Sequence, residues 1–325
     1  MNLLKRSGVL VIKERVVPIY NEKLEALLRR LPQGHAKRQD IADELAKRQA
    51  GFRGEQSLDY HLSFLPKDYC ILHDLRLSDQ DRFFQIDTLI ITPSFILILE
   101  VKNFSGTLFF DTAFHQLIRT LNGKEEAFPD PVLQVKRQQR QLSAWLESKK
   151  FISIPIEALV VVASPYTIIK GNHELQRVVT HSGNFENLMN KLEKKHTEDV
   201  LSKKEMRKLS NLLLRNHTPS DINILQRFYL SKKDLLPGVW CPCCEALSMI
   251  RAWGGRWICN QCQQTSTDAH IQALQDYILL FGPVITGPRI REFLRLPSKS
   301  VTTKLIKSLN LPSTGTTKDR IYHLN

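Results

Sequence analysis

Two acidic residues and a lysine near the middle of the chain have the types and spacing of a hydrolytic metal site. They are Asp87, Glu100 and Lys102, in two apolar stretches that Pro93-Ser94 separates. If Pro93-Ser94 form the turn of a β-hairpin, residues whose numbers sum to 187 lie opposite each other, so Asp87 faces Glu100. Opposed carboxylates repel each other, and a divalent cation with oxygen ligands would neutralise them. Lys102 projects to the same face as Glu100, where its charge could orient a water molecule or stabilise a phosphorus centre under attack.

The hairpin register also predicts which side chains share a face. Proline is unusual in a tight hairpin turn, so a wider loop is the alternative. The three polar residues could also form an ordinary salt bridge at the strand ends, because a match to this acidic pattern is common. With the two-residue turn, one face carries the pairs Ile86–Val101, Thr88–Leu99 and Ile90–Leu97, and the other carries Leu89–Ile98, Ile91–Ile96 and Asp87–Glu100.

A helix expected before the hairpin adds a third carboxylate. Leu58, Leu62 and Leu65 form an apolar stripe on this helix, and Glu55 falls on the same stripe one turn earlier. A carboxylate on an inward face needs a partner. Glu55 is therefore either a further metal ligand or a cap for a neighbouring group.

A helix expected from Pro131 to Glu147 carries polar groups that suit a nucleic-acid backbone. Its apolar residues Val135, Leu142 and Trp145 can pack inward. A solvated helix face is the alternative. The polar groups are the glutamines Gln134, Gln138 and Gln141 and the cations Lys136, Arg137 and Arg140.

Four cysteines near the C-terminus have the spacing of a structural zinc site. Cys241 and Cys244 form one CxxC pair, and Cys259 and Cys262 form a second pair fourteen residues later. Two such pairs complete a tetrahedral Zn²⁺ site, and four thiolates leave no open position for catalysis. Cys243 competes with Cys244 for a ligand position; we assign Cys244 because its spacing repeats in the second pair.

The residues around these cysteines predict a zinc ribbon. Residues 247–257 can form a hairpin around Gly254-Gly255. Trp240, Trp253 and Trp257 lie nearby and offer surfaces for base stacking, or else pack a module that is too small to have a core of its own. The remaining cysteine, Cys70, is expected to be a buried structural thiol.

The C-terminal segment resembles a winged-helix DNA-binding unit. Residues 285–294 and 301–309 are expected to form two helices, followed by a basic hairpin at residues 314–324. A small helical packing module is the alternative. The residues expected on the recognition helix are Thr302, Thr303, Lys304 and Lys307.

The elements around the carboxylates describe an α/β domain with a mixed sheet. Helices are expected near residues 22–31 and from about residue 36 to residue 65, and again within residues 185–216. The apolar run Ile156–Ala163 is typical of a strand buried on both faces. Other strands are expected at residues 69–73, 83–91, 95–102, 106–110 and 114–121, the last closed by an Asn122-Gly123 turn.

Composition agrees with a globular protein that binds a polyanion. The 325 residues include 46 Lys and Arg against 33 Asp and Glu, a net charge of +13, and 42% of the residues are hydrophobic. These values exclude wholesale disorder and favour nucleic acid as a partner. The apolar region Leu89–Val101 is interrupted by Thr92-Pro93-Ser94 and cannot supply the ~20 residues of a membrane span. Clustered cysteines and the lack of a signal-peptide core predict a cytoplasmic protein.

Four ordered motifs resemble the nuclease-related domain (NERD) family, a branch of the restriction-endonuclease-like PD-(D/E)XK superfamily. The resemblance spans roughly residues 40–163 and implies an αβββαβ core with Asp87 and Glu100 as metal ligands and Lys102 as the catalytic lysine. It also implies that Glu55 and Gln134 complete the site. Asp130 stands where the family pattern has asparagine, and Phe114 where it has tryptophan. The motifs are Gly51-Phe-Arg-Gly54-Glu55, Phe84-Gln-Ile-Asp87-Thr-Leu-Ile, Glu100-Val-Lys102-Asn103 with Gly106, and Pro131-Val-Leu-Gln134.

We therefore expect a nuclease that uses Mg²⁺ or Mn²⁺, with a structural Zn²⁺, acting on DNA rather than RNA in processing, repair or defence. Protein partners from a defence or repair system are expected, and no membrane contact. A non-catalytic DNA-binding or scaffolding protein is the alternative. The expected division is a helical extension at residues 1–36, the nuclease-like domain at 37–183, a helical linker region at 184–237, the zinc ribbon at 238–267 and the winged-helix-like module at 268–325.

Overall fold

The computed structural model describes residues 10–79, 82–316 and 320–324, and the chain forms two compact units. The first unit consists of the residues up to Val16 together with Gln49–Ser220, and the second of Val17–Arg48 together with Asp221–Asn325. One helix, α2 (Arg38–Leu62), contributes its first part to the second unit and its remainder to the first.

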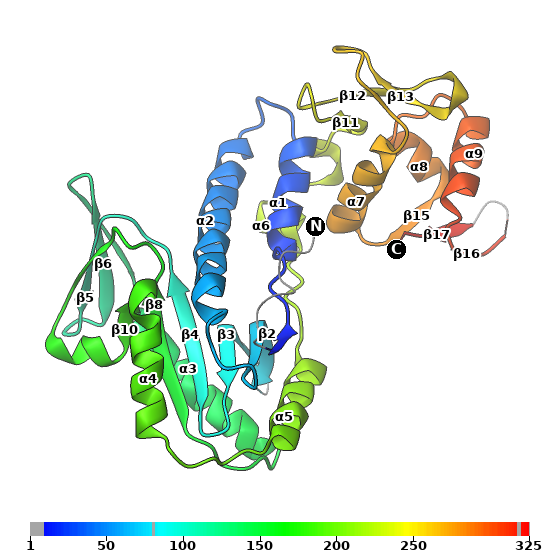
Figure 1. The fold of residues 1–325 in the computed structure, drawn as a ribbon. Coiled ribbons are helices and arrows are strands. Elements are labelled where there is room, and N and C mark those ends of the chain that lie inside the picture. Colours follow the sequence, from blue (N-terminus) through cyan, green and yellow to red (C-terminus); the bar gives the residue numbers. More distant parts are fainter. Residues whose placement is uncertain (1–9, 80–81, 317–319, 325) are drawn as a thin grey trace. The chain divides into compact units, whose positions relative to one another are not determined.

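The first unit is built on a six-stranded mixed sheet (Figure 1) in the order β1-β2-β3-β4-β8-β10. The antiparallel strands β2, β3 and β4 follow α2, and α3 then leads to β8, which is parallel to β4. This is the expected αβββαβ core. The strands are β1 (Leu10–Lys13), β2 (Cys70–Asp79), β3 (Arg82–Ile91), β4 (Ile96–Lys102), β8 (Ile156–Val162) and β10 (Val179–His181); the helices added to α2 are α3 (Pro131–Ser148), α4 (Phe185–Lys195) and α5 (Lys203–Asn216).

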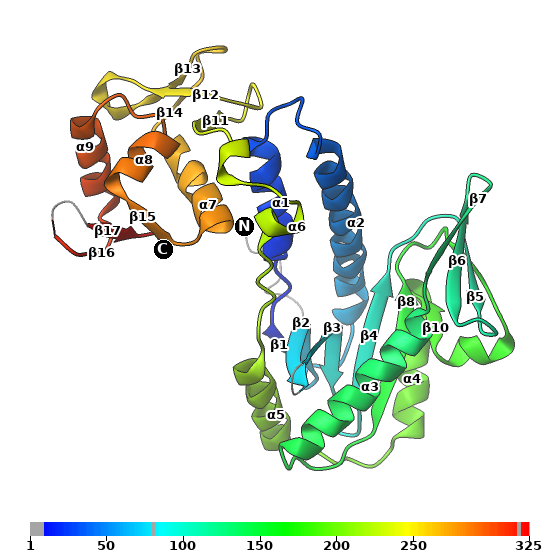
Figure 2. The ribbon, with the colours of Figure 1, turned by 180° about the vertical axis from the view of Figure 1, so that it is seen from behind.

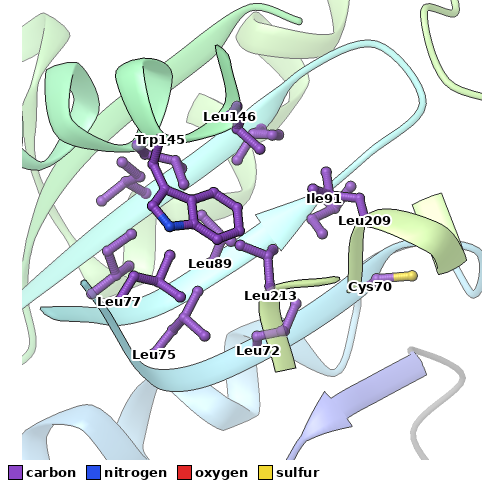
Figure 3. Close-up of a cluster of buried hydrophobic side chains, with 14 of the residues drawn as sticks. Cys70, Leu72, Leu75, Leu77, Leu89, Ile91, Trp145, Leu146, Leu209 and Leu213 are labelled. Carbon is purple, nitrogen blue, oxygen red and sulfur yellow. The ribbon is translucent and has the colours of Figure 1, made fainter. Parts of the chain in front are cut away.

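Helices cover both faces of this sheet. On one face, α3 and α5 pack on β2 and β3 around Trp145, Leu209 and Leu213 (Figure 3). On the other face, α2 and α4 pack on β4 and β8. Figure 1 shows α4 in front of the sheet, and Figure 2, seen from behind, shows α3 lying across it. The sheet is thus buried on both sides, which explains the continuous apolar sequence of β8.

The β3–β4 hairpin has the expected register over four residue pairs, from Ile91↔Ile96 to Thr88↔Leu99. Its turn is closed by Thr92, whose amide donates to the carbonyl of Phe95 at 3.0 Å. Thr92 Oγ1 also accepts from the Phe95 amide at 2.9 Å. This side-chain cap replaces the glycine or asparagine that tight hairpins normally use. The two-residue turn at Pro93-Ser94 is therefore confirmed.

The expected alternation of faces is wrong beyond Thr88. Ile86 was assigned to the face of Ile90, but it packs with Leu89 in the cluster on the α3 side. The pairing of β2 with β3 omits Asp74 and Asp87, and Asp74 has a φ of 49°. A residue in this left-handed conformation reverses which side of the strand the following side chains face. The irregularity lies beside one of the predicted catalytic carboxylates.

A second, four-stranded sheet in the order β7-β6-β5-β9 also belongs to the first unit. Asn122 and Gly123 have φ values of 52° and 76° and form the expected turn, but β6 begins at Gln116 rather than Phe114. The strand after the turn is not apparent from the sequence, because Lys124-Glu125-Glu126 lacks apolar alternation. These strands are β5 (Thr107–Asp111), β6 (Gln116–Leu121), β7 (Lys124–Pro129) and β9 (Ile168–Lys170).

The second unit combines a zinc-ribbon-like sheet with a helical module. Strands β11 (Val239–Cys241), β12 (Ala246–Arg251), β13 (Trp257–Cys259) and β14 (Thr265–Ser266) form one antiparallel sheet, in which Arg251 pairs with Trp257 across the expected glycine turn. The helices are α1 (Ile19–Arg30), α6 (Ile224–Arg227), α7 (Ala269–Phe281), α8 (Gly287–Phe293) and α9 (Lys299–Leu309); the remaining strands are β15 (Val284–Thr286), β16 (Ser313–Thr314) and β17 (Ile321–His323).

The end of this unit has the connectivity of a winged helix. The order is α7, β15, α8, α9, β16, β17, and β17 pairs with both β15 and β16. Residues 317–319, in the expected basic hairpin, lie outside the described residues. Asp276 of α7 is fully buried and accepts from Arg30 at 2.9 Å and from Arg29 at 2.8 Å. These ion pairs attach α1 to α7 across nearly the whole sequence.

Among the described residues, none of the helices combines the length and the apolar character needed to cross a membrane.

Candidate active site and zinc centre

Asp87 lies on β3 where the hairpin ladder ends. The last pair is Thr88↔Leu99, one pair before the expected Asp87–Glu100 pair. In its place the Asp87 side chain accepts a hydrogen bond from the Val101 amide at 2.9 Å through Oδ2. The carboxylate thus substitutes for a backbone acceptor and is held at the end of β4. This bond fixes Asp87 beside the residue that precedes Val101, which is Glu100.

Glu100 is buried and held through both of its oxygens. Its side chain is 4% exposed. Oε1 accepts from Lys102 Nζ at 2.7 Å, and Oε2 accepts from Gln138 Nε2 at 2.9 Å. Lys102 also donates to Gln134 Oε1 at 3.2 Å. The structure therefore brings together Glu100, Lys102 and Gln134, which the sequence placed on two different elements.

Gln138 is a site residue that sequence reasoning did not assign. It is 4% exposed and bridges Glu100 to the Gln85 carbonyl, which its amide nitrogen contacts at 2.8 Å. Gln134, Gln138 and Gln141 recur at one face of α3, and this spacing was the available signal. Gln141 donates to Asp79 at 3.1 Å. The glutamines of α3 thus bind protein groups on the sheet.

The burial of these carboxylates is electrostatically unfavourable. Burial raises the pKa of Asp87 well above its usual range, and the neighbouring carboxylates of Glu100 and Glu55 raise it further. Lys102 opposes this shift. Gln138 Oε1 is buried and has no hydrogen-bond partner among the described residues. An acceptor without a donor and a surplus of buried negative charge both suit a cation.

Glu55 occupies the inward stripe of α2, as expected, and is paired with an arginine. Its Oε2 accepts from Arg15 at 2.7 Å. Burial, assisted by the negative charge of Glu100 and opposed by Arg15, raises the pKa of Glu55 to about 7. The negative charge of Glu100 therefore affects the pKa of Glu55. Arg15 was not among the expected site residues, and no local signal in the sequence marks it.

The donor set fits a hard divalent cation. Asp87, Glu100 and Glu55 offer carboxylate oxygens, which Mg²⁺ and Mn²⁺ prefer. Within the described ranges, four cysteines form the one group of three or more His, Cys, Asp or Glu residues whose ligand atoms all lie within 4.8 Å of one another. The carboxylates thus have the chemistry of a metal site, in an arrangement held by Lys102 and Arg15.

Gly54 allows α2 to approach the carboxylates. A Cβ atom at this position would lie 2.3 Å from Asn103 Cβ. Asn103 follows β4 directly and donates to the Ala50 carbonyl of α2 at 2.7 Å. The helix turn that carries Glu55 is therefore in direct contact with the strand end that carries Glu100 and Lys102. This contact gives a physical reason for glycine in the Gly51-Phe-Arg-Gly54-Glu55 motif.

We predict that Gly54→Ala destabilises the protein by about 1–3 kcal/mol, because the added methyl group overpacks the contact with Asn103. Gly51→Ala is the matched control, since Gly51 lies in the same helix and a Cβ there meets nothing within 4 Å. The control should raise stability by roughly 0.5–1 kcal/mol, because alanine favours helix more than glycine does. Thermal melting of both variants measures the effect. Equal shifts would show that the close approach is absent.

The cations expected to bind nucleic acid are exposed. Lys136, Arg137 and Arg140 lie on the solvent side of α3. On α9, the residues Thr303, Lys304 and Lys307 are exposed. Thr302 differs from its neighbours, because it is buried and its hydroxyl donates to the Ser298 carbonyl at 2.9 Å.

The four cysteines of the two CxxC pairs form a candidate metal site. Cys241 and Cys259 are the last residues of β11 and β13, and the sulfur atoms of Cys241 and Cys262 lie 3.7 Å apart, as do those of Cys244 and Cys259. Cys243 is exposed and lies outside this group. Four converging thiols are the donor set that Zn²⁺ prefers in structural sites. Cys70 is buried in the main core of the first unit.

The tryptophans near these four cysteines differ in their surroundings. Trp257 is fully buried, and its Nε1 donates to His270 Nδ1 at 3.1 Å. Trp240 is half-buried. Trp253, beside the turn between β12 and β13, is 99% exposed. Packing therefore explains Trp257, whereas Trp253 keeps a free ring surface.

Comparison with known proteins gives one match. No curated protein and no solved structure matches this chain. Residues 50–163 match the family model described as the nuclease-related domain, NERD. The matched residues begin within α2 and end just after β8, so they contain Glu55, Asp87, Glu100, Lys102 and Gln134. The match to the NERD family model thus covers about a third of the chain, and that third includes the candidate active site.

Proposed function

We propose that the protein is a Mg²⁺- or Mn²⁺-dependent nuclease that hydrolyses phosphodiester bonds. The observation that carries this proposal is the arrangement of Asp87, Glu100, Lys102 and Gln134 at the open end of the β3–β4 hairpin, inside the segment that matches the NERD family. A buried carboxylate, Glu100, and the half-buried Asp87 beside a fixed lysine suit the stabilisation of negative charge on a phosphate.

The proposed roles follow from the contacts. Asp87, Glu100 and Glu55 would hold the divalent cation, which lowers the pKa of bound water and stabilises charge on phosphate oxygens. Glu100 and Gln134 fix the amino group of Lys102 from two sides. Lys102 then presents its charge in one position, where it orients the attacking water or stabilises the pentavalent phosphorus. Gln134 acts through Lys102.

DNA binding is proposed for two exposed basic surfaces. The first is on α3, beside the carboxylates. The second is on α9 of the winged-helix-like module, next in sequence to the zinc ribbon that Cys241, Cys244, Cys259 and Cys262 would form around a structural Zn²⁺. The net charge of +13 supports a polyanionic partner. We propose DNA rather than RNA, and a cytoplasmic role in processing, repair or defence with protein partners from such a system. The residues proposed to bind DNA are Lys136, Arg137 and Arg140 on α3 and Thr303, Lys304 and Lys307 on α9.

A second candidate function is non-catalytic DNA binding or scaffolding. The ion pair between Lys102 and Glu100, at 2.7 Å, favours this alternative. In that case Lys102 serves as a permanent counter-ion for Glu100. The protein would then bind DNA and cut none.

The deciding experiment compares cleavage of several DNA and RNA substrates by the wild type, Glu100→Ala and Lys102→Ala. Each protein is assayed with Mg²⁺, with Mn²⁺ and with a chelator. We expect cleavage by the wild type with either metal and none with the chelator or with either variant. If the wild type binds DNA but leaves every substrate intact, the nuclease proposal is wrong and the binding function stands. Cleavage that persists in Glu100→Ala would indicate a contaminating enzyme.

A further inference from the structure

Arg15 connects two elements that carry the candidate active site. It follows β1, and its side chain is only 4% exposed. On α2, Nη1 donates to Glu55 Oε2 at 2.7 Å, and Nη2 donates to Asp59 Oδ1 at 3.2 Å. On the sheet, Nη2 lies 2.9 Å from His73 Nδ1 and 3.1 Å from Thr88 Oγ1. One guanidinium therefore links the helix to β2 and β3.

The contacts on the sheet side place Arg15 close to Asp87. Thr88, which Arg15 contacts, is the residue directly after Asp87, and it is fully buried. His73 pairs with Thr88 across the ladder. Burial, together with the positive charges of Arg15 and Lys13, lowers the pKa of His73 to about 3. His73 is thus neutral and can accept the hydrogen bond from Arg15.

The contacts on the helix side place Arg15 between two like charges. Glu55 and Asp59 are four residues apart on α2, so their carboxylates face the same side and repel each other. Arg15 bonds to both through separate nitrogens. Its planar, multiply donating group suits this arrangement, whereas the single ammonium of a lysine does not.

Arg15 donates a hydrogen bond to one carboxylate oxygen of Glu55 and does not contact the other. Within the described part of the chain, the structure gives Glu55 Oε1 no hydrogen-bond partner, while Oε2 is held at 2.7 Å. Metal-binding carboxylates in proteins are commonly held this way, with an outer partner that fixes their orientation. Arg15 lies outside the residues that match the NERD family, which begin at residue 50.

We propose that Arg15 is a positioning residue of the divalent-cation site, which acts by holding Glu55 so that its second oxygen is available to the metal. The N-terminal segment is then a functional part of the active site. This inference rests on the proposed nuclease function, because it assumes that Glu55 is a metal ligand.

The alternative is that Arg15 only attaches α2 to the sheet. In that case the loss of the Arg15 side chain lowers the stability of the protein. Any effect of this loss on metal affinity would then be equal in the wild-type and Glu55→Gln backgrounds. The two roles are separated by a double-mutant cycle between Arg15 and Glu55, because coupled residues give effects that do not add.

The test measures Mn²⁺ binding to the full chain without substrate, by electron paramagnetic resonance or calorimetry, and in parallel the Mn²⁺ dependence of DNA cleavage. The proteins are the wild type, Arg15→Met, Arg15→Lys, Glu55→Gln and the double variant Arg15→Met with Glu55→Gln. Asp59→Asn is the matched control, because it removes the other anchor of Arg15 and keeps the bond between Arg15 and Glu55. Circular dichroism and thermal melting of each variant report folding.

We expect Arg15→Met to weaken Mn²⁺ binding by about 10–100-fold, the usual effect of losing an outer partner of a ligand. In the Glu55→Gln background the same substitution should change affinity by less than about twofold. Asp59→Asn should bind Mn²⁺ like the wild type even where it lowers the melting temperature. Arg15→Lys, which keeps the charge and one donor to Glu55, should recover part of the affinity and remains informative if Arg15→Met does not fold.

The results that overturn the inference differ from those that overturn the proposed function. If the wild type binds Mn²⁺ and cleaves DNA, but Arg15→Met weakens binding equally in both Glu55 backgrounds or in neither, Arg15 is structural and the nuclease proposal stands. If the wild type binds Mn²⁺ and cleaves nothing, the binding cycle still decides the role of Arg15 while the nuclease proposal fails. If the wild type binds no Mn²⁺, both are wrong.

Discussion

Glu100→Gln is expected to lower DNA cleavage by about 1000-fold or more, equivalent to roughly 4 kcal/mol of transition-state stabilisation. Glu100 accepts hydrogen bonds from two donors, Lys102 at Oε1 and Gln138 at Oε2. A glutamine amide has one accepting oxygen, so its nitrogen would face one of these donors and that contact would be lost. The substitution also removes a charge that the cation would bind.

Lys102→Met should lower cleavage by about 100–1000-fold, as the loss of a charge-stabilising donor does in other active sites. Its effect on metal affinity should have the opposite sign. Lys102 is the cation that now neutralises Glu100 at 2.7 Å, and without it the buried carboxylates attract Mn²⁺ more strongly.

The two variants are distinguished by measuring the rate at saturating Mn²⁺ and the Mn²⁺ concentration at half-maximal cleavage. Glu100→Gln should raise the half-maximal concentration, and Lys102→Met should lower it or leave it unchanged. Lys204→Met is a control, because Lys204 is an exposed lysine on α5, away from the proposed site and DNA-binding residues. If Lys102→Met weakens Mn²⁺ binding as Glu100→Gln does, the lysine organises the site and does not act on the phosphate.

Cys259→Ser is expected to abolish zinc binding and unfold the small sheet of residues 239–266. The strands of this sheet are two to six residues long, and Cys241 and Cys259 are fully buried between them. So short a module buries too little apolar surface to be stable alone. Binding of a structural Zn²⁺ contributes about 10–16 kcal/mol to the folding of comparable modules, so its loss exceeds what the remaining contacts supply.

The measurement is metal analysis combined with tryptophan fluorescence. The wild type should contain about one zinc per chain, because four thiolates complete one site. Trp257, which is fully buried and bonded to His270, should become exposed in Cys259→Ser and shift its emission to longer wavelength. Cys243→Ser is the control, since Cys243 is exposed and lies outside the thiol group. A folded Cys259→Ser protein without metal would refute the zinc centre.

Local features of the sequence were sufficient for much of the fold. The register of the β3–β4 hairpin follows from its turn and its apolar alternation, and four residue pairs agree with it. The boundaries of α3 follow from Pro131 at its start and from Asp130, whose carboxylate accepts from the Val132 amide at 2.8 Å. Asp130 caps the helix as asparagine would, so this departure from the family pattern keeps its physical role.

Features that depend on one residue in an uncommon conformation were not predictable. The change of face at Ile86 coincides with an irregularity at which Asp74 of β2 and Asp87 of β3 both drop out of the pairing, and Asp74 has a φ of 49°. An aspartate in the left-handed region is permitted but uncommon, and nothing in the neighbouring residues requires it. The sequence therefore placed Asp87 on the correct strand and assigned Ile86 to the wrong face.

By itself the sequence determined which residues carry the candidate chemistry: three carboxylates, a lysine and four cysteines, whose types and spacing are local properties. The tertiary structure decided what surrounds them. Gln138 holds Glu100 from α3, Arg15 holds Glu55 from the N-terminal segment, and Arg29 and Arg30 attach α1 to Asp276. These partners are 38, 40, and about 250 residues apart in the chain. A buried charge requires a partner, but it does not specify from where in the chain that partner comes, because only the packing of the helices on the sheet brings distant side chains within bonding distance.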